Sequence, residues 1–300
     1  MRAKATDEFM KIAYHIGTYG TDEDLLLRIL LANRAALSAR GVLVPAPSRY
    51  RRVIIESLRN LGGVPPSPAM QGALLDVIMD EDHADRLILS GEQFLGPPSR
   101  ALGPIGLFPY ARRSAAELVS LFPDHDCEFH LALRHPAAFL TALLPRLSDP
   151  RYERMMDGLH PHRLRWSEAV RRFLDGANGR RLVVWCHEDA PLILPEVARR
   201  LADVGPDLAI HGTGQLLTRL LRPEGIALLE DAMRDNPPAT VGARRELVAQ
   251  ALTRFARPEE VERAVMFPGW DDIMMEDLDD IYDDDVAEIA AMPGVEFIAP

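Results

Sequence analysis

Side chains that could bind a ligand or move a proton follow four short apolar segments of the sequence. Glu92 comes after one segment, and a loop of small and hydroxyl residues at 17–21 comes after another. Arg134 and the run 187–189 follow the other two. Ligands of open parallel sheets bind outside the carboxyl ends of the strands. If the four segments are strands of one such sheet, these side chains share one edge of it and form a candidate site.

Two other groups of residues suggest metal binding, but a simpler interpretation is favoured for each. His160 and His162 flank a proline with no cysteine nearby, so we expect a loop and no metal site. The acidic run 271–285 lacks the glycine and the ligand spacing of an EF-hand loop. We expect instead an amphipathic helix over about 271–291, whose acidic face could bind a basic partner protein. Its expected apolar face is Ile273, Met274, Leu278, Ile281, Val286 and Ile289.

The elements that would position these side chains alternate between two periodicities. Apolar runs that close on glycine or polar residues predict four strands, and helical patterns separate them. Such alternation is typical of βαβ units and a parallel sheet. The predicted strands are 11–16, 86–89, 128–133 and 181–186, and the helical patterns are 68–82, 112–122, 137–147 and 165–175.

The last third of the chain is predicted to be largely helical. Its final segment, 293–298, is either an edge strand or a packed tail. No composition break divides the chain, so we expect one three-layer α/β domain over 1–300, with the sheet mostly from 11–190 and a helical part over 191–300. The expected helices there are 191–204, 214–220, 223–235, 240–256 and 258–265.

The first helix after the 17–21 loop has a marked beginning. Thr21 is followed three residues later by Asp24, the pattern of a capping residue and a carboxylate in the first turn. Acidic residues there also complement the positive end of the helix dipole. We therefore expect Thr21 to cap a helix that runs to about Gly41, a natural residue for a helix end.

Composition excludes several classes of function. The net charge of −11 argues against a nucleic-acid surface, which needs clustered basic residues. The first ten residues lack the apolar core of a signal peptide, and no run reaches the roughly 18 apolar residues of a membrane span. We expect a cytoplasmic protein. Its two cysteines have neither disulfide-framework nor zinc spacing, and the sequence leaves the oligomeric state open.

Several segments follow one another in an order known from one enzyme family. His15-Ile16-Gly17-Thr18, the helix segment 30–37 and the run 40–45 are followed by 87–92, 133–136, 184–189 and 293–300. The family patterns are H-I-G-x-x-K-T-G-T-T-S-L, a helix with A-N-R, strands ending in S-x-E and R-x-P, and a P-G-V tail. In this order and spacing the chain resembles the bacterial sulfotransferase-like proteins, which have a P-loop NTPase-like fold.

The resemblance implies a reaction and a set of residues. Members of the family transfer a sulfuryl group from 3′-phosphoadenosine 5′-phosphosulfate (PAPS) to a hydroxyl or amine. Backbone N–H groups and a lysine of the first loop hold the 5′-phosphate at a helix N-terminus. An arginine and a serine hold the 3′-phosphate. By position, the resemblance assigns nucleotide binding to Gly17, Thr18, Tyr19, Gly20, Thr21 and Arg134, and the general base to Glu92.

The first loop departs from the family where the phosphate would bind. Gly20 stands in the lysine position, and three carboxylates replace a glycine and two hydroxyl residues. Like charges ~4 Å apart repel by about 1 kcal/mol in water and about 4 at a dielectric of 20. Several such repulsions would move a micromolar affinity beyond millimolar. The three carboxylates are Asp22, Glu23 and Asp24, and the second phosphate site has Ala142 and Thr141 near the serine position.

Three hypotheses follow. The first is a sulfotransferase-fold pseudoenzyme that serves as a binding or regulatory protein and requires no cofactor. The second is an active PAPS-dependent sulfotransferase with an atypical nucleotide site, which would use Arg134 and Glu92. The third is a protein that acts on a different, less anionic ligand in the same cleft.

Overall fold

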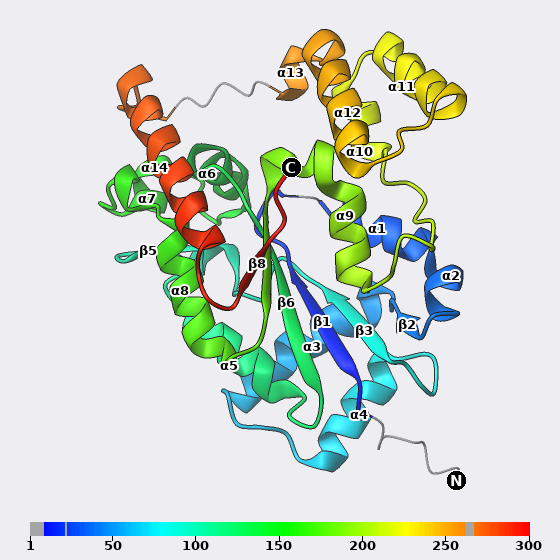
Figure 1. Cartoon of the computed structure of the whole chain (residues 1–300). Helices are drawn as coiled ribbons and strands as arrows, with labels where there is room; N and C mark the ends of the chain where they lie inside the picture. The colour runs from blue at the N-terminus through cyan, green and yellow to red at the C-terminus, as the bar shows by residue number, and fades with distance from the viewer. Residues whose placement is uncertain (1–8, 22, 262–266) are drawn as a thin grey trace.

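The computed structural model describes residues 9–21, 23–261 and 267–300. Its centre is a parallel sheet of six strands in the order β2-β3-β1-β6-β7-β8. The carboxyl ends of the strands lie at the top of Figure 1. The strands are β1 (Lys11–Ile16), β2 (Val42–Leu43), β3 (Arg86–Ser90), β6 (Asp126–Leu133), β7 (Leu182–Cys186) and β8 (Val295–Phe297), with a separate hairpin of β4 (Leu102–Gly103) and β5 (Gly106–Leu107).

Helices cover both faces of this sheet and bury two apolar clusters. One face carries α3 (Pro47–Leu61), α4 (Pro68–Ile78), α5 (Ala111–Leu121), α6 (Pro136–Leu143), α7 (Tyr152–Met156) and α8 (Trp166–Ala177). The other face carries α1 (Leu25–Ala32), α2 (Arg34–Ser38) and α9 (Ala190–Ala202). The three-layer α/β architecture predicted from the sequence is therefore confirmed, and α14 (Asp272–Ala290) packs beside α8 and α6 (Figure 1).

A group of short helices after α9 has a small apolar cluster of its own. It comprises α10 (Gln215–Leu220), α11 (Pro223–Asp235), α12 (Val241–Phe255) and α13 (Pro258–Val261), and lies beyond the carboxyl end of the sheet (Figure 1). The buried residues of this cluster are Leu221, Leu229, Val248 and Ala251. Arg244 of α12 joins the group to α9, because its Nη2 donates to Glu196 Oε2 at 2.8 Å. The predicted helical C-terminal third is confirmed over the described residues, while residues 262–265 of the helix predicted over 258–265 lie outside them.

The predicted strands match the structure closely, and the tail forms β8, a parallel edge strand. The helix expected over 25–41 is interrupted. It stops at Ala32, and Asn33 turns its amide to the loop 205–214: its Nδ2 donates to the His211 carbonyl at 2.8 Å and its Oδ1 accepts from the His211 N–H at 2.9 Å. The buried amide thus connects α1 to that distant loop, an interaction that periodicity does not reveal.

A buried ionic cluster fixes α9 against the sheet. Glu128 on β6 is 2% exposed and accepts from Arg86, from His130 Nε2 at 2.8 Å and from Arg200 Nη1 at 2.8 Å. Arg200 of α9 also donates through its Nε to Glu296 of β8 at 2.7 Å. Burial lowers the pKa of His130 to about 4, so the ring is neutral at pH 7 and donates to Glu128. The cluster joins β3, β6, α9 and the C-terminal strand.

The acidic helix α14 is fixed by one of its own acids. Asp285 is 1% exposed and accepts from the backbone N–H groups of Trp166 and Ser167 and from Arg165 Nε at 2.6 Å. It therefore caps α8 from a distant helix. The predicted amphipathic character is confirmed, but Ile273 was wrongly assigned to the apolar face because it is 69% exposed. The buried face is Leu278, Tyr282, Asp285 and Ile289.

Candidate functional site

A cavity of about 560 Å³ lies at the carboxyl ends of β1, β6 and β7. Its walls come from the first loop, from α1 and α9, and from the helical group that begins with α10. The apolar part of the lining is Leu25, Leu26, Ala132, Ala138, Trp185, Ala190, Pro191, Leu194, Val197, Leu216, Leu220, Leu252 and Ala256. A mostly apolar hollow with a few polar groups is the usual form of a small-molecule site, and the volume lies within the roughly 300–1,000 Å³ common for such sites.

The hydroxyl groups of the first loop point inward rather than toward a ligand. Thr18 Oγ1 donates to the Ala132 carbonyl at 2.7 Å, and Thr21 Oγ1 donates to the Thr18 carbonyl at 2.8 Å. Tyr19 is fully buried, and its hydroxyl donates to the Gly96 carbonyl at 2.7 Å. Of the six predicted nucleotide-binding residues, only Gly20, Thr21 and Arg134 line the cavity.

Arg134 is fixed by two hydrogen bonds, one made by its side chain and one by its backbone carbonyl. Its Nη1 donates to the Gly20 carbonyl, and its own carbonyl accepts from Trp166 Nε1 at 2.7 Å. Gly20 has φ +78°, and a Cβ added there would collide with Ala142 Cβ and Arg134 Nη1. The side chain that the family uses for the 3′-phosphate therefore lies on the backbone of the loop that the family uses for the 5′-phosphate.

The acidic end of the loop does not cap α1, so the predicted role of Thr21 was wrong. The helix begins at Leu25, and Asp24 at its N-cap has φ 66° and makes no side-chain cap. Glu23 is also left-handed, at φ 48°. Thus neither described acid lies in the first helical turn, while Asp22 lies outside the described residues.

Asp24 instead forms a forked ion pair. Arg51 of α3 donates from Nη1 and Nη2 to its two oxygens at 2.9 and 2.5 Å, and this contact holds the pKa of the Asp24 carboxyl below its usual range. Arg51 Nε also donates to the Ser90 carbonyl at 2.9 Å, so the pair connects the loop to the end of β3. No element was predicted from the sequence over 47–61, where α3 lies, so this pair could not be foreseen.

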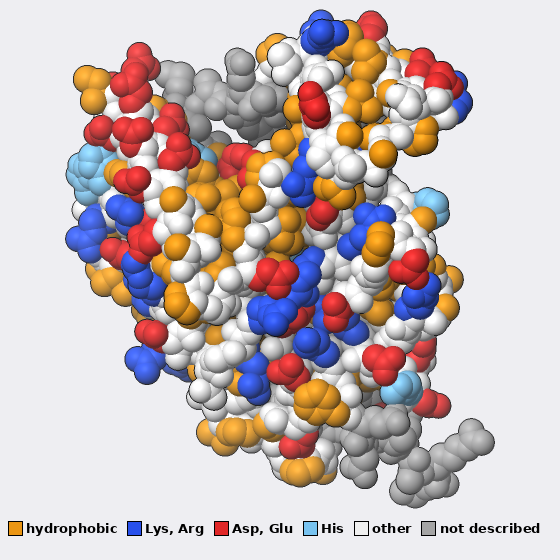
Figure 2. Space-filling model, in the orientation of Figure 1, with side chains coloured by type: hydrophobic (Ala, Val, Ile, Leu, Met, Phe, Trp, Pro, Cys, Tyr) orange, Lys and Arg blue, Asp and Glu red, His pale blue; other side chains and the backbone are white. Residues whose placement is uncertain are grey.

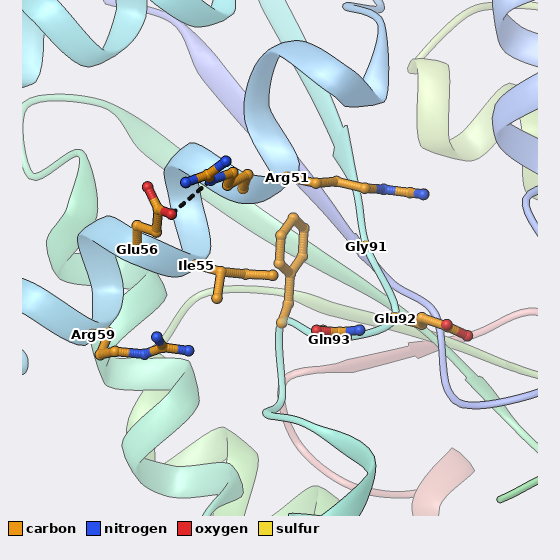
Figure 3. A pocket seen from close by; sticks show the side chains of 9 residues that line it. Arg51, Ile55, Glu56, Arg59, Gly91, Glu92 and Gln93 are labelled. Carbon is orange, nitrogen blue, oxygen red and sulfur yellow. Dashed lines mark hydrogen bonds and ion pairs between the residues drawn. The ribbon is translucent and has the colours of Figure 1, made fainter. Parts of the chain in front are cut away.

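Glu92 lines a different hollow. It belongs to a groove of about 430 Å³ between α3 and the segment after β3, with Arg51, Ile55, Arg59 and Phe94 among the lining residues. In Figure 3 the side chains of Arg51 and Glu92 both extend away from the end of the groove that holds Arg59 and Glu56. Glu92 is not among the residues that line the 560 Å³ cavity. Glu92 and Arg134 thus line different hollows, although both border the first loop: a Cβ at Gly17 would lie 3.7 Å from Glu92 Cβ, and Arg134 contacts Gly20.

The floor of the cavity carries two stacked rings. His15 of β1 is 1% exposed, and its Nδ1 lies 2.9 Å from Ser90 Oγ. The His15 ring stacks on that of Trp185 with centroids 5.9 Å apart and planes at 18°. The strand between them, β6, carries Ala132 in register with Trp185, and its small side chain leaves room for the rings to meet. Neither residue was among the site residues predicted from the sequence.

One wall of the cavity is a short turn, His187–Asp189, at the end of β7. Glu188 in it accepts from the His135 N–H at 2.8 Å and from the Tyr282 hydroxyl at 3.0 Å. Burial and then the charge of Glu188 raise the pKa of Tyr282, so its hydroxyl remains a donor. The run 187–189 is therefore a fixed wall of the cavity, held in part by α14.

Lysine is absent from the described part of this site. The whole sequence has two lysines, Lys4 and Lys11. Lys11 is the first residue of β1, which places it one strand length, roughly 20 Å, from the loop that follows Ile16. Lys4 lies outside the described residues.

Other classes of site are not found in the described residues. Within 9–21, 23–261 and 267–300, no group of His, Cys, Asp and Glu side chains could hold a metal ion. His160 and His162 lie in and beside a 3-10 turn, where His160 Nδ1 accepts from the His162 N–H at 3.3 Å. Across the same ranges, every helix is too short or too polar to cross a lipid bilayer.

Comparison with known proteins gives a distant structural similarity and no match in sequence. No protein-family model matches the sequence, and neither does any curated protein. Among solved structures, the chain is similar to the sulfotransferase domain from the Synechococcus PCC 7002 olefin synthase, with 14% identity, a TM-score of 0.39, and coverage of 95% of this chain and 98% of that one. A likeness at this level carries no argument about activity.

Proposed function

We propose that this protein is a sulfotransferase-like pseudoenzyme: a binding or regulatory protein that takes a small molecule other than PAPS in the cavity at the carboxyl edge of its sheet. The contact of Arg134 with the Gly20 carbonyl carries the proposal. A nucleotide that used both family phosphate sites would have to separate these two groups and then bind beside Glu23.

The energetics of the loop support this assignment. Phosphate loops bind anions through exposed N–H groups and a cationic side chain. Here the Thr21 N–H donates to the Thr18 carbonyl at 3.2 Å, and the hydroxyls of both threonines are engaged within the protein. The cost of removing such hydrogen bonds, about 1 kcal/mol each, adds to the repulsion from the carboxylates.

The positions of the candidate catalytic groups support it further. A general base must come within hydrogen-bond reach of the proton that it removes. Glu92 lines the groove beside α3, whereas Arg134 lines the cavity beside α9. Glu92 is not among the residues that line the cavity with Arg134, and we take this as support for a lost pairing of base and sulfuryl donor.

A turnover assay tests this proposal. Purified protein is incubated with PAPS and a panel of phenols, alcohols and amines, and release of adenosine 3′,5′-bisphosphate is followed. We expect no release above that of a protein-free control. Turnover that is lost in both Arg134→Ala and Glu92→Gln would overturn the proposal and establish the active sulfotransferase. An activity that persists in both variants would point to a contaminant, which a second purification would remove.

A further inference from the structure

The charges around the cavity do not match those of a nucleotide site. Among the described residues, three carboxylates line it, those of Glu23, Glu188 and Glu260, against the guanidinium groups of Arg134 and Arg219. Glu23, Glu188 and Arg219 are exposed, and Arg134 donates to the neutral Gly20 carbonyl. The fixed charges of the described lining therefore sum to one negative unit.

The best-placed of these carboxylates lacks a cationic partner among its described contacts. Glu188 accepts from a backbone N–H and from a tyrosine hydroxyl, both neutral donors that orient the carboxylate without cancelling its charge. Its neighbours respond to that charge. Burial and then Glu188 raise the pKa of Asp189, and burial, with Asp189, Glu188 and Asp283 adding to it, raises the pKa of the Cys186 thiol to about 12.

The charge of the molecule as a whole is also negative. Acidic side chains gather over α14 (Figure 2), whose Tyr282 reaches Glu188. The whole chain carries a net charge of −11. A negative field of this kind raises the local concentration of cations and lowers that of anions.

The remaining lining is apolar and partly aromatic. Leu26, Leu194, Leu216 and Leu252 come from four different helices and surround the central space. The indole of Trp185 forms part of the inner end, and an indole is the best of the aromatic surfaces for holding a cation. A ligand that fits these walls removes apolar surface from water and places one polar group near the carboxylates.

We infer that the ligand of this cavity is a small molecule with an apolar, drug-sized body and a single positively charged group. The inference rests on the proposed function, because a PAPS-binding protein would fill the same space with a polyanion. The positive group lies on the Glu188 side of the cavity, and the apolar body lies between α1, α9, α10 and α12.

A matched series of probes tests the charge. The full-length protein is titrated by calorimetry with 4-phenylbutylamine, 4-phenylbutanol and 4-phenylbutyrate, which share one body and differ in the charge of the head group. We expect the amine to bind at least 10-fold more tightly than the carboxylate, with the alcohol between them. A carboxylate that binds as tightly as the amine would overturn the inference and leave small-molecule binding intact.

Two variants locate the binding. The change E188Q should weaken the amine about 3- to 10-fold and leave the alcohol unchanged, while E224Q on α11 should change neither. L216W should fill the cavity and weaken all three probes at least 10-fold, while M233W, an exposed position on α11, should not. Unchanged binding in L216W would place the probes elsewhere and overturn the inference.

A parallel titration with adenosine 3′,5′-bisphosphate distinguishes a failure of the proposed function from a failure of the inferred ligand class. Micromolar binding of this nucleotide would refute the proposed function itself. Failure of both the nucleotide and all three probes to bind would overturn the ligand class and leave the loss of the nucleotide site standing.

Discussion

The guanidinium of Arg134 donates a hydrogen bond to the carbonyl of Gly20, so the ends of two parallel strands are joined across the site. Arg134 follows β6, and Gly20 lies in the loop after the neighbouring β1. In the family that the sequence resembles, an arginine here meets a phosphate. In this protein the same side chain instead stabilises the conformation of the first loop.

Removal of this arginine should destabilise the fold. Arg134→Ala should lower the free energy of unfolding by about 1.5–3 kcal/mol, the usual contribution of a hydrogen bond to a charged group. Arg146→Ala is the matched control, because Arg146 is exposed and donates to a helical carbonyl nearby, that of Ala142. The control should lose no more than about 0.5 kcal/mol. Urea unfolding measures both, and equal losses would show that the Arg134 contact contributes nothing special.

Gly20 should tolerate no side chain. Gly20→Ala combines a left-handed backbone with a collision against Ala142 and Arg134, whereas Gly62, at φ +57°, has open space around its Cβ position. Gly62→Ala should therefore cost only the conformational term, about 1–2 kcal/mol. Gly20→Ala should cost at least about 1 kcal/mol more, since over-packing typically adds 1–3. Thermal unfolding measures the stability of both variants. Equal losses of stability would contradict the close contact of Gly20 with Ala142 and Arg134.

Two adjacent acids of α14 should behave differently. Asp285→Ala leaves the first backbone donors of α8 without their acceptor and Arg165 without its closer carboxylate partner. The expected loss is about 2–4 kcal/mol, which combines a cap with a buried charged contact. Asp284→Ala, at an exposed position, should change stability by less than about 0.5 kcal/mol. If the two variants melt together, the capping role of Asp285 is refuted.

Stability should fall as the pH is lowered from 7 to 4. The pKa of His130 falls from 6.5 to about 4 on folding, so the unfolded chain binds more protons than the folded one between those values. Stability is therefore lost as the pH drops through this window, by on the order of 2–3 kcal/mol for this ring. Below about pH 4.5 protonation of Glu128 adds to the loss, because its pKa is lowered in the fold by its contacts with His130, Arg200 and Arg86.

His130→Gln isolates the histidine contribution. The glutamine amide can still donate to Glu128 but does not titrate, so the slope of stability against pH between 6.5 and 4 should flatten. His83→Gln, at an exposed site, serves as the control and should keep the wild-type slope. Urea midpoints at several pH values measure this, and an unchanged slope in the His130 variant would assign the pH dependence to other groups.

The sequence predicted the sheet well because its strands are short apolar runs that end on glycine or polar residues. It also located the loop at 17–21 and Arg134 at one edge of the sheet. It could not predict that Arg134 would turn to Gly20, because that contact joins residues 114 positions apart through a backbone carbonyl. The capping prediction for Thr21 failed for a related reason: Asp24 is held by Arg51, and no local pattern reveals that partner.

Two further features of the structure could not be predicted from the sequence. Leu216 and Leu252 have the spacing of ordinary helix-packing residues, and only the three-dimensional arrangement of α10 and α12 turns them toward the sheet edge. Asp285 looked like one acid in a run of acids, and its burial depends on how α14 meets α8. Helical periodicity finds a face, but it does not say which face meets which neighbour.

Calorimetric titration of the purified protein with adenosine 3′,5′-bisphosphate is the most direct test of the closed nucleotide loop. The nucleotide carries both phosphates that the family sites would hold, and it needs no acceptor. We expect no binding up to millimolar nucleotide. Binding at micromolar concentration that is lost in Arg134→Ala would contradict this expectation, since Arg134 would then leave the Gly20 carbonyl for a phosphate.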